Sequence, residues 1–176
     1  MVNIAALEAV NQSELSHERL LAVLRYEPET GLFFWKIRTS FRVMPGRQAG
    51  SIGPNGYIEI GLDNKNYQAH RLAWFYMTGE WPALQIDHKD TDRANNAWSN
   101  LREATHGQNV NNSGPRKNNT SGFKGVSFFK PKQRWHARIM HEGQLHLLGY
   151  FNTPEAAHAA YARKAHELHG EFARVA

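Results

Sequence analysis

The N-terminal part of the chain changes from a helical to an extended pattern of apolar residues. Leucines and a valine recur at helical spacing over residues 4–25, which predicts a helix there, and Ser16 is a candidate cap for a second start within it. An aromatic run over residues 32–36 predicts a short strand. Residues 38–55 hold repeated glycine and proline, so they are expected to form a loop.

The central part predicts a hairpin and a short buried helix, followed by the order strand, loop, strand, helix. Thr105 is followed three residues later by Gln108, the spacing of a capping box, so we expect the last helix to begin there. The hairpin is predicted over residues 57–62 and 67–70, the buried helix over 71–78, and the strand, loop and second strand over 84–86, 89–99 and 100–102.

The C-terminal part predicts a small sheet and one helix. Thr153 precedes Pro154 as a cap precedes an N1 proline, which predicts a helix that ends at Gly170. Alternation along the middle strand separates two faces. The strands are expected over residues 123–129, 134–140 and 145–151. The side chains expected under the helix are Trp135, Ala137 and Ile139, packed on Ala156, Ala160 and Tyr161; those expected to face outward are Arg134, His136 and Arg138, with Lys124 on the adjacent strand.

Composition favours a folded protein outside the membrane. Of the 176 residues, 41% are apolar and 21% are charged, which is typical of a chain with a packed core. The absence of cysteine excludes disulfide scaffolds, zinc–thiolate fingers, iron–sulfur clusters and thiol nucleophiles. No apolar run reaches the roughly 20 residues of a membrane-spanning helix, and the N-terminus does not resemble a signal peptide. We therefore expect a soluble, cytoplasmic protein with no membrane partner.

Positive charge is concentrated in one stretch. The net charge is +5, and no acidic residue occurs between Glu103 and Glu142. The basic residues of that stretch alternate with aromatic ones, a pattern that indicates either a polyanion-binding surface or an ordinary solvated basic face. The basic residues that we expect to bind nucleic acid, together with one histidine, are Lys117, Lys124, Lys130, Lys132, Arg134, His136 and Arg138.

Four polar residues of the central part form the strongest candidate for a site. Asp87 and His88 end one predicted strand, Asn100 begins the next, and Asn109 lies on the helix that follows. Carboxylate and amide oxygens are hard ligands suited to Mg²⁺ or Mn²⁺, and an imidazole can act as a base near neutral pH. A calcium loop is excluded, because counting from Asp87 or Asp90 puts other residues at the required glycine and glutamate positions.

Two segments resemble known families. The segment IDHKDTDRANNAWSNLREATHGQNVNN, preceded by HRLAWFYMTGEWP, resembles the catalytic motif of the HNH endonucleases of phage and intron homing type. The segment that begins GFKGVSFFKPKQRWHARI resembles an AP2 DNA-binding domain. The resemblance implies an α+β protein with a ββα-metal nuclease core, preceded by a helical and β-hairpin region and followed by an AP2-like sheet and helix. The implied domains are residues 1–55, the nuclease core 56–112, a linker 113–121 and the AP2-like module 122–176.

The resemblance also implies a role for each residue of the motif. His88 would be the general base, Asn100 would orient the His88 ring, and Asp87 and Asn109 would bind the metal. The third letter of the motif is Asn here rather than His, which argues against zinc and for one hard divalent cation, Mg²⁺ or Mn²⁺. His106 is an alternative third ligand.

The expected function is metal-dependent cleavage of double-stranded DNA. The HNH resemblance implies products with a 3′-hydroxyl and a 5′-phosphate, and the AP2-like module would direct cutting to a target. Two other hypotheses are a DNA-binding transcriptional regulator with a silent nuclease core and an RNA-binding protein with a basic sheet. The sequence leaves the oligomeric state open. For a phage-encoded protein, the compartment would be the host cytoplasm.

Overall fold

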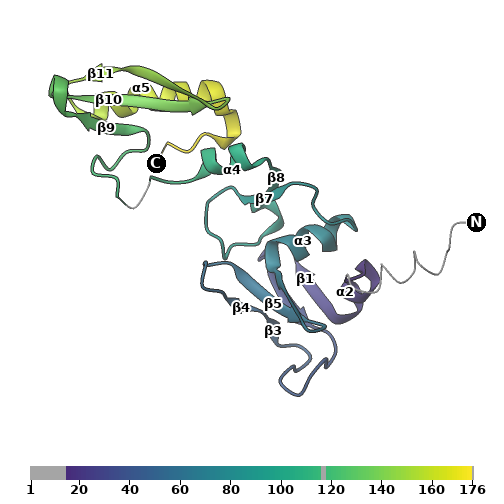
Figure 1. The fold of residues 1–176 in the computed structure, drawn as a ribbon. Helices are drawn as coiled ribbons and strands as arrows, with labels where there is room; N and C mark the ends of the chain where they lie inside the picture. Colours follow the sequence, from purple (N-terminus) through teal and green to yellow (C-terminus); the bar gives the residue numbers. More distant parts are fainter. Residues whose placement is uncertain (1–14, 116–117, 176) are drawn as a thin grey trace, which may run out of the picture. The chain divides into compact units, whose positions relative to one another are not determined.

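The computed structural model describes residues 15–115 and 118–175, which form mixed α and β structure in two compact units. The units are Met1–Glu103 and Ala104–Ala176 (Figure 1). The boundary falls inside the predicted nuclease core of residues 56–112, so the two units are described separately. No helix in the described ranges is both long and apolar enough to cross a membrane.

The first unit opens with a short helix and a small antiparallel sheet. Ser16 caps the helix by accepting a hydrogen bond from the backbone of Arg19, as predicted. The helix ends earlier than expected, because Leu24 is buried and pairs with Trp35 across the sheet. The predicted residues 4–14 lie outside the described part. The elements are α2 (His17–Val23), β1 (Leu24–Glu27), β2 (Leu32–Trp35) and β3 (Gln48–Ala49), in the sheet order β1-β2-β3.

A second antiparallel sheet and a helix complete the core of this unit. Asp63 and Asn64 both have positive φ, 49° and 62°, and make the two-residue turn that joins the predicted hairpin. The predicted loop over residues 38–55 is wrong in part, because β3 and β4 lie within it. The elements are β4 (Ser51–Ile52), β5 (Ile58–Leu62), β6 (Lys65–Gln68) and α3 (Ala69–Thr78). The largest side chains buried between the sheets and helices are Leu20, Leu24, Phe33, Ile60, Leu62 and Leu72.

The predicted order of strand, loop, strand and helix is confirmed, with shifted bounds. The strands are β7 (Gln85–His88) and β8 (Leu101–Ala104), which pair with each other, and the turn η2 (Trp98–Asn100) precedes β8. Asn100 therefore ends a turn rather than beginning a strand. The helix is α4 (His106–Asn112), and the Thr105–Gln108 capping box is present as predicted.

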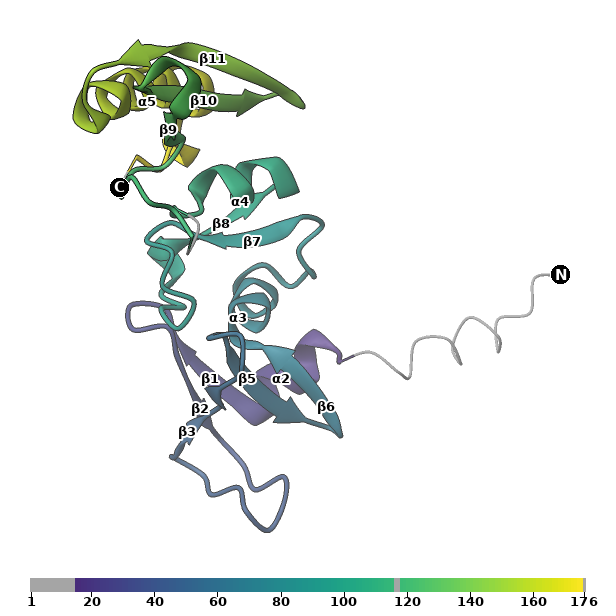
Figure 2. The same ribbon diagram turned by 60° about the vertical axis from the view of Figure 1, so that its left-hand side comes forward.

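The second unit packs one helix on one face of a three-stranded antiparallel sheet (Figure 2). Tyr161 is buried as expected, whereas Ala157 and Ala165, rather than Ala156 and Ala160, line the core, because they lie on the helix face turned to the sheet. The elements are β9 (Val126–Phe129), η3 (Lys130–Lys132), β10 (Arg134–His141), β11 (Gln144–Phe151), α5 (Pro154–His169) and η4 (Gly170–Phe172). Thr153 caps α5 as predicted.

Candidate active site and candidate DNA-binding residues

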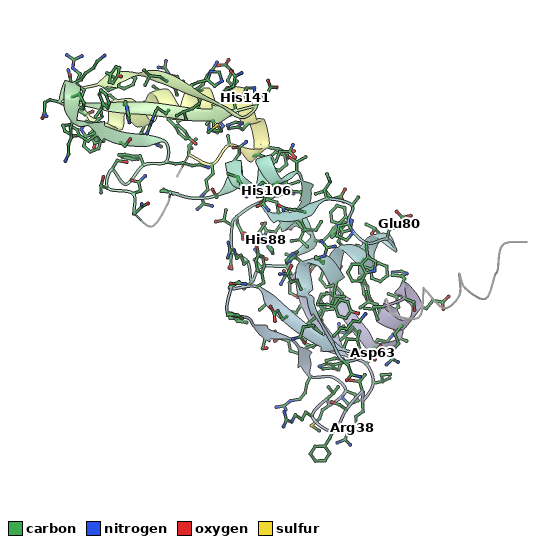
Figure 3. All side chains as sticks on the ribbon, in the orientation of Figure 1. Arg38, Asp63, Glu80, His88, His106 and His141 are labelled. Carbon is green, nitrogen blue, oxygen red and sulfur yellow. The ribbon has the colours of Figure 1, made fainter. Side chains whose placement is uncertain are left out.

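Strand β7 delivers the two strongest candidate residues to one place. Asp87 and His88 are adjacent at its end, and each is only 4% exposed (Figure 3). The backbone N–H of Lys89 donates to the carbonyl of Asn100 at 2.9 Å, which holds the start of the following loop against the turn before β8. The first three residues of the predicted motif therefore lie in a single strand–loop–strand arrangement of the first unit.

Asn96, a residue that the sequence pattern did not single out, holds the His88 ring. Its Oδ1 lies 3.2 Å from His88 Nε2. Its own position is fixed twice, because its Nδ2 donates to the carbonyl of Ala94 at 3.1 Å and its carbonyl accepts from the Tyr26 hydroxyl at 2.7 Å. Asn96 is 2% exposed, so this bond is shielded from water.

The structure corrects the role predicted for Asn100. Its Nδ2 donates to Asp90 Oδ1 at 2.9 Å and to the Asn95 carbonyl at 2.8 Å, and its Oδ1 accepts from the Asp90 backbone at 3.1 Å. Asn100 thus ties Asp90 to Asn95 within the loop, whereas the His88 ring is held by Asn96. The physical reason is that the side chain comes from a turn behind the loop rather than from the paired strand.

The Asp87 carboxylate forms an ion pair with the side chain of Arg102. Arg102 on β8 approaches Asp87 Oδ2 with both Nε and Nη2 at 2.9 Å, and both side chains are largely buried. A buried carboxylate requires such compensation, because an unpaired charge away from water is costly. Arg102 therefore compensates the charge of the Asp87 carboxylate and holds it toward β8.

The aromatic ring of Tyr57 and a second histidine, His70, lie against His88. The rings of His70 and Tyr57 lie 5.0 Å and 5.9 Å from the His88 ring. Burial lowers the pKa of His88, while the hydrogen bond that its ring makes to Asn96 Oδ1 and the nearby carboxylates act in the opposite direction. Burial also lowers the pKa of His70 to about 3, with further contributions from His88 and Arg71. Both imidazoles are therefore held toward the neutral form.

The predicted metal ligands offer oxygen atoms, which suit a hard cation, rather than the nitrogen atoms of several histidines. Among residues 15–115 and 118–175 there is no group of three or more His, Cys, Asp or Glu side chains that could hold a metal ion. The predicted ligands are one carboxylate, Asp87, and one amide, Asn109, and both offer oxygen. Asn109 lies on α4 in the second unit, as does the alternative ligand His106, which is exposed.

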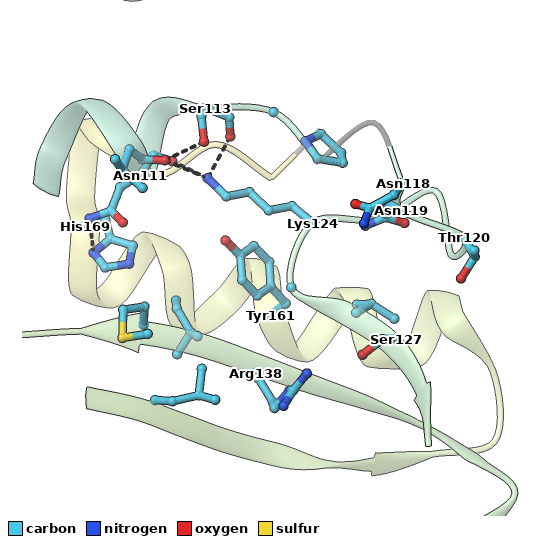
Figure 4. A pocket seen from close by; sticks show the side chains of 18 residues that line it. Asn111, Ser113, Asn118, Asn119, Thr120, Lys124, Ser127, Arg138, Tyr161 and His169 are labelled. Carbon is cyan, nitrogen blue, oxygen red and sulfur yellow. Dashed lines mark hydrogen bonds between the residues drawn. The ribbon is translucent and has the colours of Figure 1, made fainter. Parts of the chain in front are cut away.

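Two of the residues predicted to bind DNA have structural roles instead. Lys124 is partly buried, and its Nζ donates to the carbonyls of Asn111 at 2.5 Å and Ser113 at 2.7 Å, at the end of α4 (Figure 4). Burial, with Arg174 nearby, lowers its pKa to about 8. His136 is 7% exposed and lies 2.6 Å from the Ser127 hydroxyl. The polar atoms of both side chains are thus engaged within the second unit.

The remaining predicted DNA-binding residues fall into two groups. Arg134 and Arg138 are exposed on β10, and Lys130 and Lys132 are exposed on η3. The Lys132 ammonium lies 4.0 Å from the centre of the Tyr150 ring, a cation–π contact. Lys117 lies outside the described residues.

Comparisons with known proteins agree on one family. A family model described as HNH endonuclease matches residues 67–111. Protein 3.8 of Escherichia phage T7 is 37% identical over 106 residues, which are 60% of this chain and 87% of the phage protein. The uncharacterized HNH endonuclease L560 of Acanthamoeba polyphaga mimivirus is 34% identical over 69% of this chain and 63% of its own length.

The DNA endonuclease I-HmuI of Bacillus phage SP01 is 41% identical over 66 residues, 35% of this chain and 38% of its own length. A solved structure described as DNA binding and cleavage by the HNH homing endonuclease I-HmuI is 21% identical, covers 84% of this chain and 85% of its own, and has a TM-score of 0.41. The matched residues 67–111 contain Asp87, His88, Asn96 and Asn100. The family model over residues 67–111 and the endonuclease relatives show that this chain contains an HNH endonuclease domain.

Proposed function

We propose that the chain is a metal-dependent endonuclease that hydrolyses phosphodiesters of double-stranded DNA to a 3′-hydroxyl and a 5′-phosphate. The observation that carries the proposal is the buried pair of Asp87 and His88 at the end of β7, inside the segment that matches the HNH endonuclease model. A relative named as a DNA endonuclease, I-HmuI, supports DNA as the substrate.

His88 is the proposed general base. Its ring is held by Asn96, and burial lowers its pKa, so the imidazole is neutral and able to accept a proton near neutral pH. In the proposed step the imidazole takes a proton from water, and the water oxygen forms a bond to phosphorus. The bond from phosphorus to the 3′ oxygen breaks, and that oxygen leaves with a proton as the 3′-hydroxyl.

Asp87 and Asn109 are the proposed ligands of one Mg²⁺ or Mn²⁺. When bound, the cation would neutralise charge on the phosphate and on the departing oxygen. Asp87 is held ready by Arg102, which compensates its charge within the protein. Loading of the site would require the carboxylate to exchange part of this ion pair for the cation.

The second unit is proposed to bring the nuclease to its target, in the manner of an AP2-like module. Its strands carry exposed Arg134 and Arg138, and η3 carries Lys130 and Lys132. Such side chains contact phosphates and base edges. His136 and Lys124 are left out of this surface because the protein itself uses their polar atoms.

The function is tested by incubating supercoiled plasmid with the purified protein, with Mg²⁺, with Mn²⁺ or with a chelator. We expect nicked or linear product only with metal, and we expect His88→Ala to reduce the rate by about 100-fold or more, since a positioned base contributes that much. Asn96→Ala should cut about tenfold more slowly, because the base loses its orientation.

His166→Ala is the matched control, since His166 is exposed on α5, and it should cut at the parent rate. Equal cutting by His88→Ala and its parent would refute His88 as the base. Metal-independent binding to DNA without any cutting, by either protein, would favour a DNA-binding regulator with a silent nuclease core.

A further inference from the structure

One face of the second unit's sheet carries large apolar side chains that are exposed to solvent. Met140, Leu145 and Leu147 are 52%, 55% and 52% exposed. The strand register places Met140 opposite Leu145, and Arg138 opposite Leu147. These four residues, with Arg134, are called the outer strand face below.

The outer strand face points away from the helix. Ala137 and Ile139 are buried in the core with α5, and neighbours along a strand point to opposite sides, so Arg138 and Met140 face outward. The register shift between Ala137 and Arg138 takes Leu148 out of the pairing and lets it pack on the core. Leu147 thereby stays on the same face as Arg138.

The charge of this surface indicates the kind of partner that binds to it. Strands β9, β10 and β11 contain no aspartate or glutamate, and Arg134 and Arg138 are exposed beside the apolar side chains. Lys132 lies over Tyr150, the cross-strand partner of His136 on the same side of the sheet. The basic side chains lie toward the η3 end of β10 and the apolar ones toward the β10–β11 turn, so a partner for this surface must offer negative charge beside apolar groups.

The major groove of a DNA duplex offers both. It admits a two-stranded β ribbon, its walls are phosphates, and the C5-methyl group of thymine is its apolar feature. Arginine in the groove pairs with guanine edges, whereas leucine has no hydrogen-bonding atoms and methionine only a weakly accepting sulfur, so neither reads the polar edges of the other bases well.

We infer that Met140, Leu145 and Leu147 contact thymine methyl groups, so that the preferred target of this nuclease contains thymine at fixed positions beside the guanine contacts of Arg138. This inference rests on the proposed DNA-binding function. It adds the class of base that the second unit selects.

The test begins with a preferred sequence. The full-length chain carrying His88→Ala, which should bind without cutting, is used to enrich bound duplexes from a random-sequence pool in the presence of Mg²⁺. The enriched duplex is then synthesised with each thymine replaced singly by deoxyuridine, which lacks only the methyl group. We expect affinity to fall about fourfold at each contacted position, the effect of leaving one methyl group unburied.

Two variants locate the effect on the outer strand face. Combined Met140→Gln and Leu147→Asn keep side-chain size and add no charge, so they should remove the preference for thymine over uracil at the positions that these two side chains contact, while the contact of Leu145 and the salt dependence of binding are kept. Ile52→Asn is the matched control, because Ile52 is 70% exposed in the first unit, and it should keep the preference. Circular dichroism of each variant checks that it is folded.

Equal affinity for thymine and uracil at every position would overturn the inference, and so would an enriched pool without a preferred sequence. A preference that is undiminished at every position in the double variant would place the readout elsewhere. Sedimentation distinguishes another occupant: a dimer of the parent that dissociates in the double variant, with unchanged DNA binding, would make this face an interface between copies. Failure of metal-dependent plasmid cutting would instead refute the proposed function, since cutting does not require base preference.

Discussion

His70 is a buried histidine that the proposed reaction does not use. It is 4% exposed, and its Nδ1 has no hydrogen-bond partner among the described residues. Its ring packs against Tyr57 and His88 at 5.0 Å in each case. A neutral imidazole tolerates this position, whereas a charged one would lie unpaired next to another titratable ring. Folding of the first unit therefore depends on His70 staying neutral.

This dependence predicts acid sensitivity. The pKa of His70 falls from its ordinary value near 6.5 to about 3, so between these values the unfolded chain binds a proton that the folded chain does not. Stability is then full above pH 6.5 and decreases as the pH falls toward 3. At pH 5 we expect the loss from this group to be about 2 kcal/mol relative to pH 7.5.

Urea unfolding of the parent and of His70→Phe at both pH values measures this loss. The comparison uses the difference between the two pH values, so any packing change caused by the larger ring cancels. His70→Phe should lose about 2 kcal/mol less than the parent on acidification. An equal loss in both proteins would show that His70 does not titrate in this range.

At the scale of elements, Lys124 joins the end of α4 to the turn before β9. The last carbonyls of a helix lack partners within it, and the Lys124 ammonium accommodates those of Val110 and Asn111 together with the Ser113 carbonyl that follows. The side chain thus replaces the contacts that a glycine cap would bring. The positive charge of Lys124 therefore interacts with backbone carbonyls of the protein itself.

Substitution of two lysines separates structural from DNA-binding charge. Lys124→Met should destabilise the second unit by about 1–3 kcal/mol, as expected for loss of a charge-assisted hydrogen bond, and should leave the salt dependence of DNA binding unchanged. Lys132→Met should reduce the slope of log affinity against log salt by about 0.9, because one counterion fewer is released. A change of salt slope in Lys124→Met, together with an unchanged slope in Lys132→Met, would contradict these roles.

Patterns within one element were predictable from the sequence, and contacts between elements were not. The caps at Ser16, Thr105 and Thr153 depend on residues three positions apart, and all are present. Lys124 was placed on a strand face, but Gly125 has φ 72° and the strand begins only at Val126, so alternation does not apply to it.

The same limit applies to the site. Asp87 and His88 are neighbours in the chain, so their joint position follows from one strand. Asn96 reaches His88 through an irregular loop whose course is fixed by Tyr26 and Asn100, and no local spacing encodes that course. For His136, alternation gave the correct side of the sheet, but Phe129 and Tyr150 cover it there.

For the whole molecule, the described buried apolar residues form two clusters, one in each unit. The second cluster centres on Tyr161, against which Gly125 packs so closely that a Cβ at Gly125 would overlap the ring. Tyr161→Ala should destabilise the second unit by about 3 kcal/mol or more, the usual cost of truncating a buried aromatic side chain.

Hydrogen exchange followed by mass spectrometry checks how far this damage extends. In Tyr161→Ala, amides of β10 and α5 should lose protection, while those of β5 and α3 should keep it. Phe33→Ala, in the other cluster, should give the opposite pattern. Equal loss in both units from either variant would mean that the chain unfolds as a single cooperative structure.

The hairpin of β1 and β2 has a consequence for anyone who recombines HNH nucleases. The turn at Gly31, with φ 74°, is packed so tightly on the backbone of Asn96 and Ala97 that no side chain fits, and the carbonyl of Pro28 accepts from the N–H of Trp98. The β1–β2 hairpin, residues 24–35, therefore holds the loop that carries Asn96 in shape. A chimera that transplants only the matched segment 67–111 into another scaffold would lack this support for the loop, even though it keeps Asp87, His88 and Asn100.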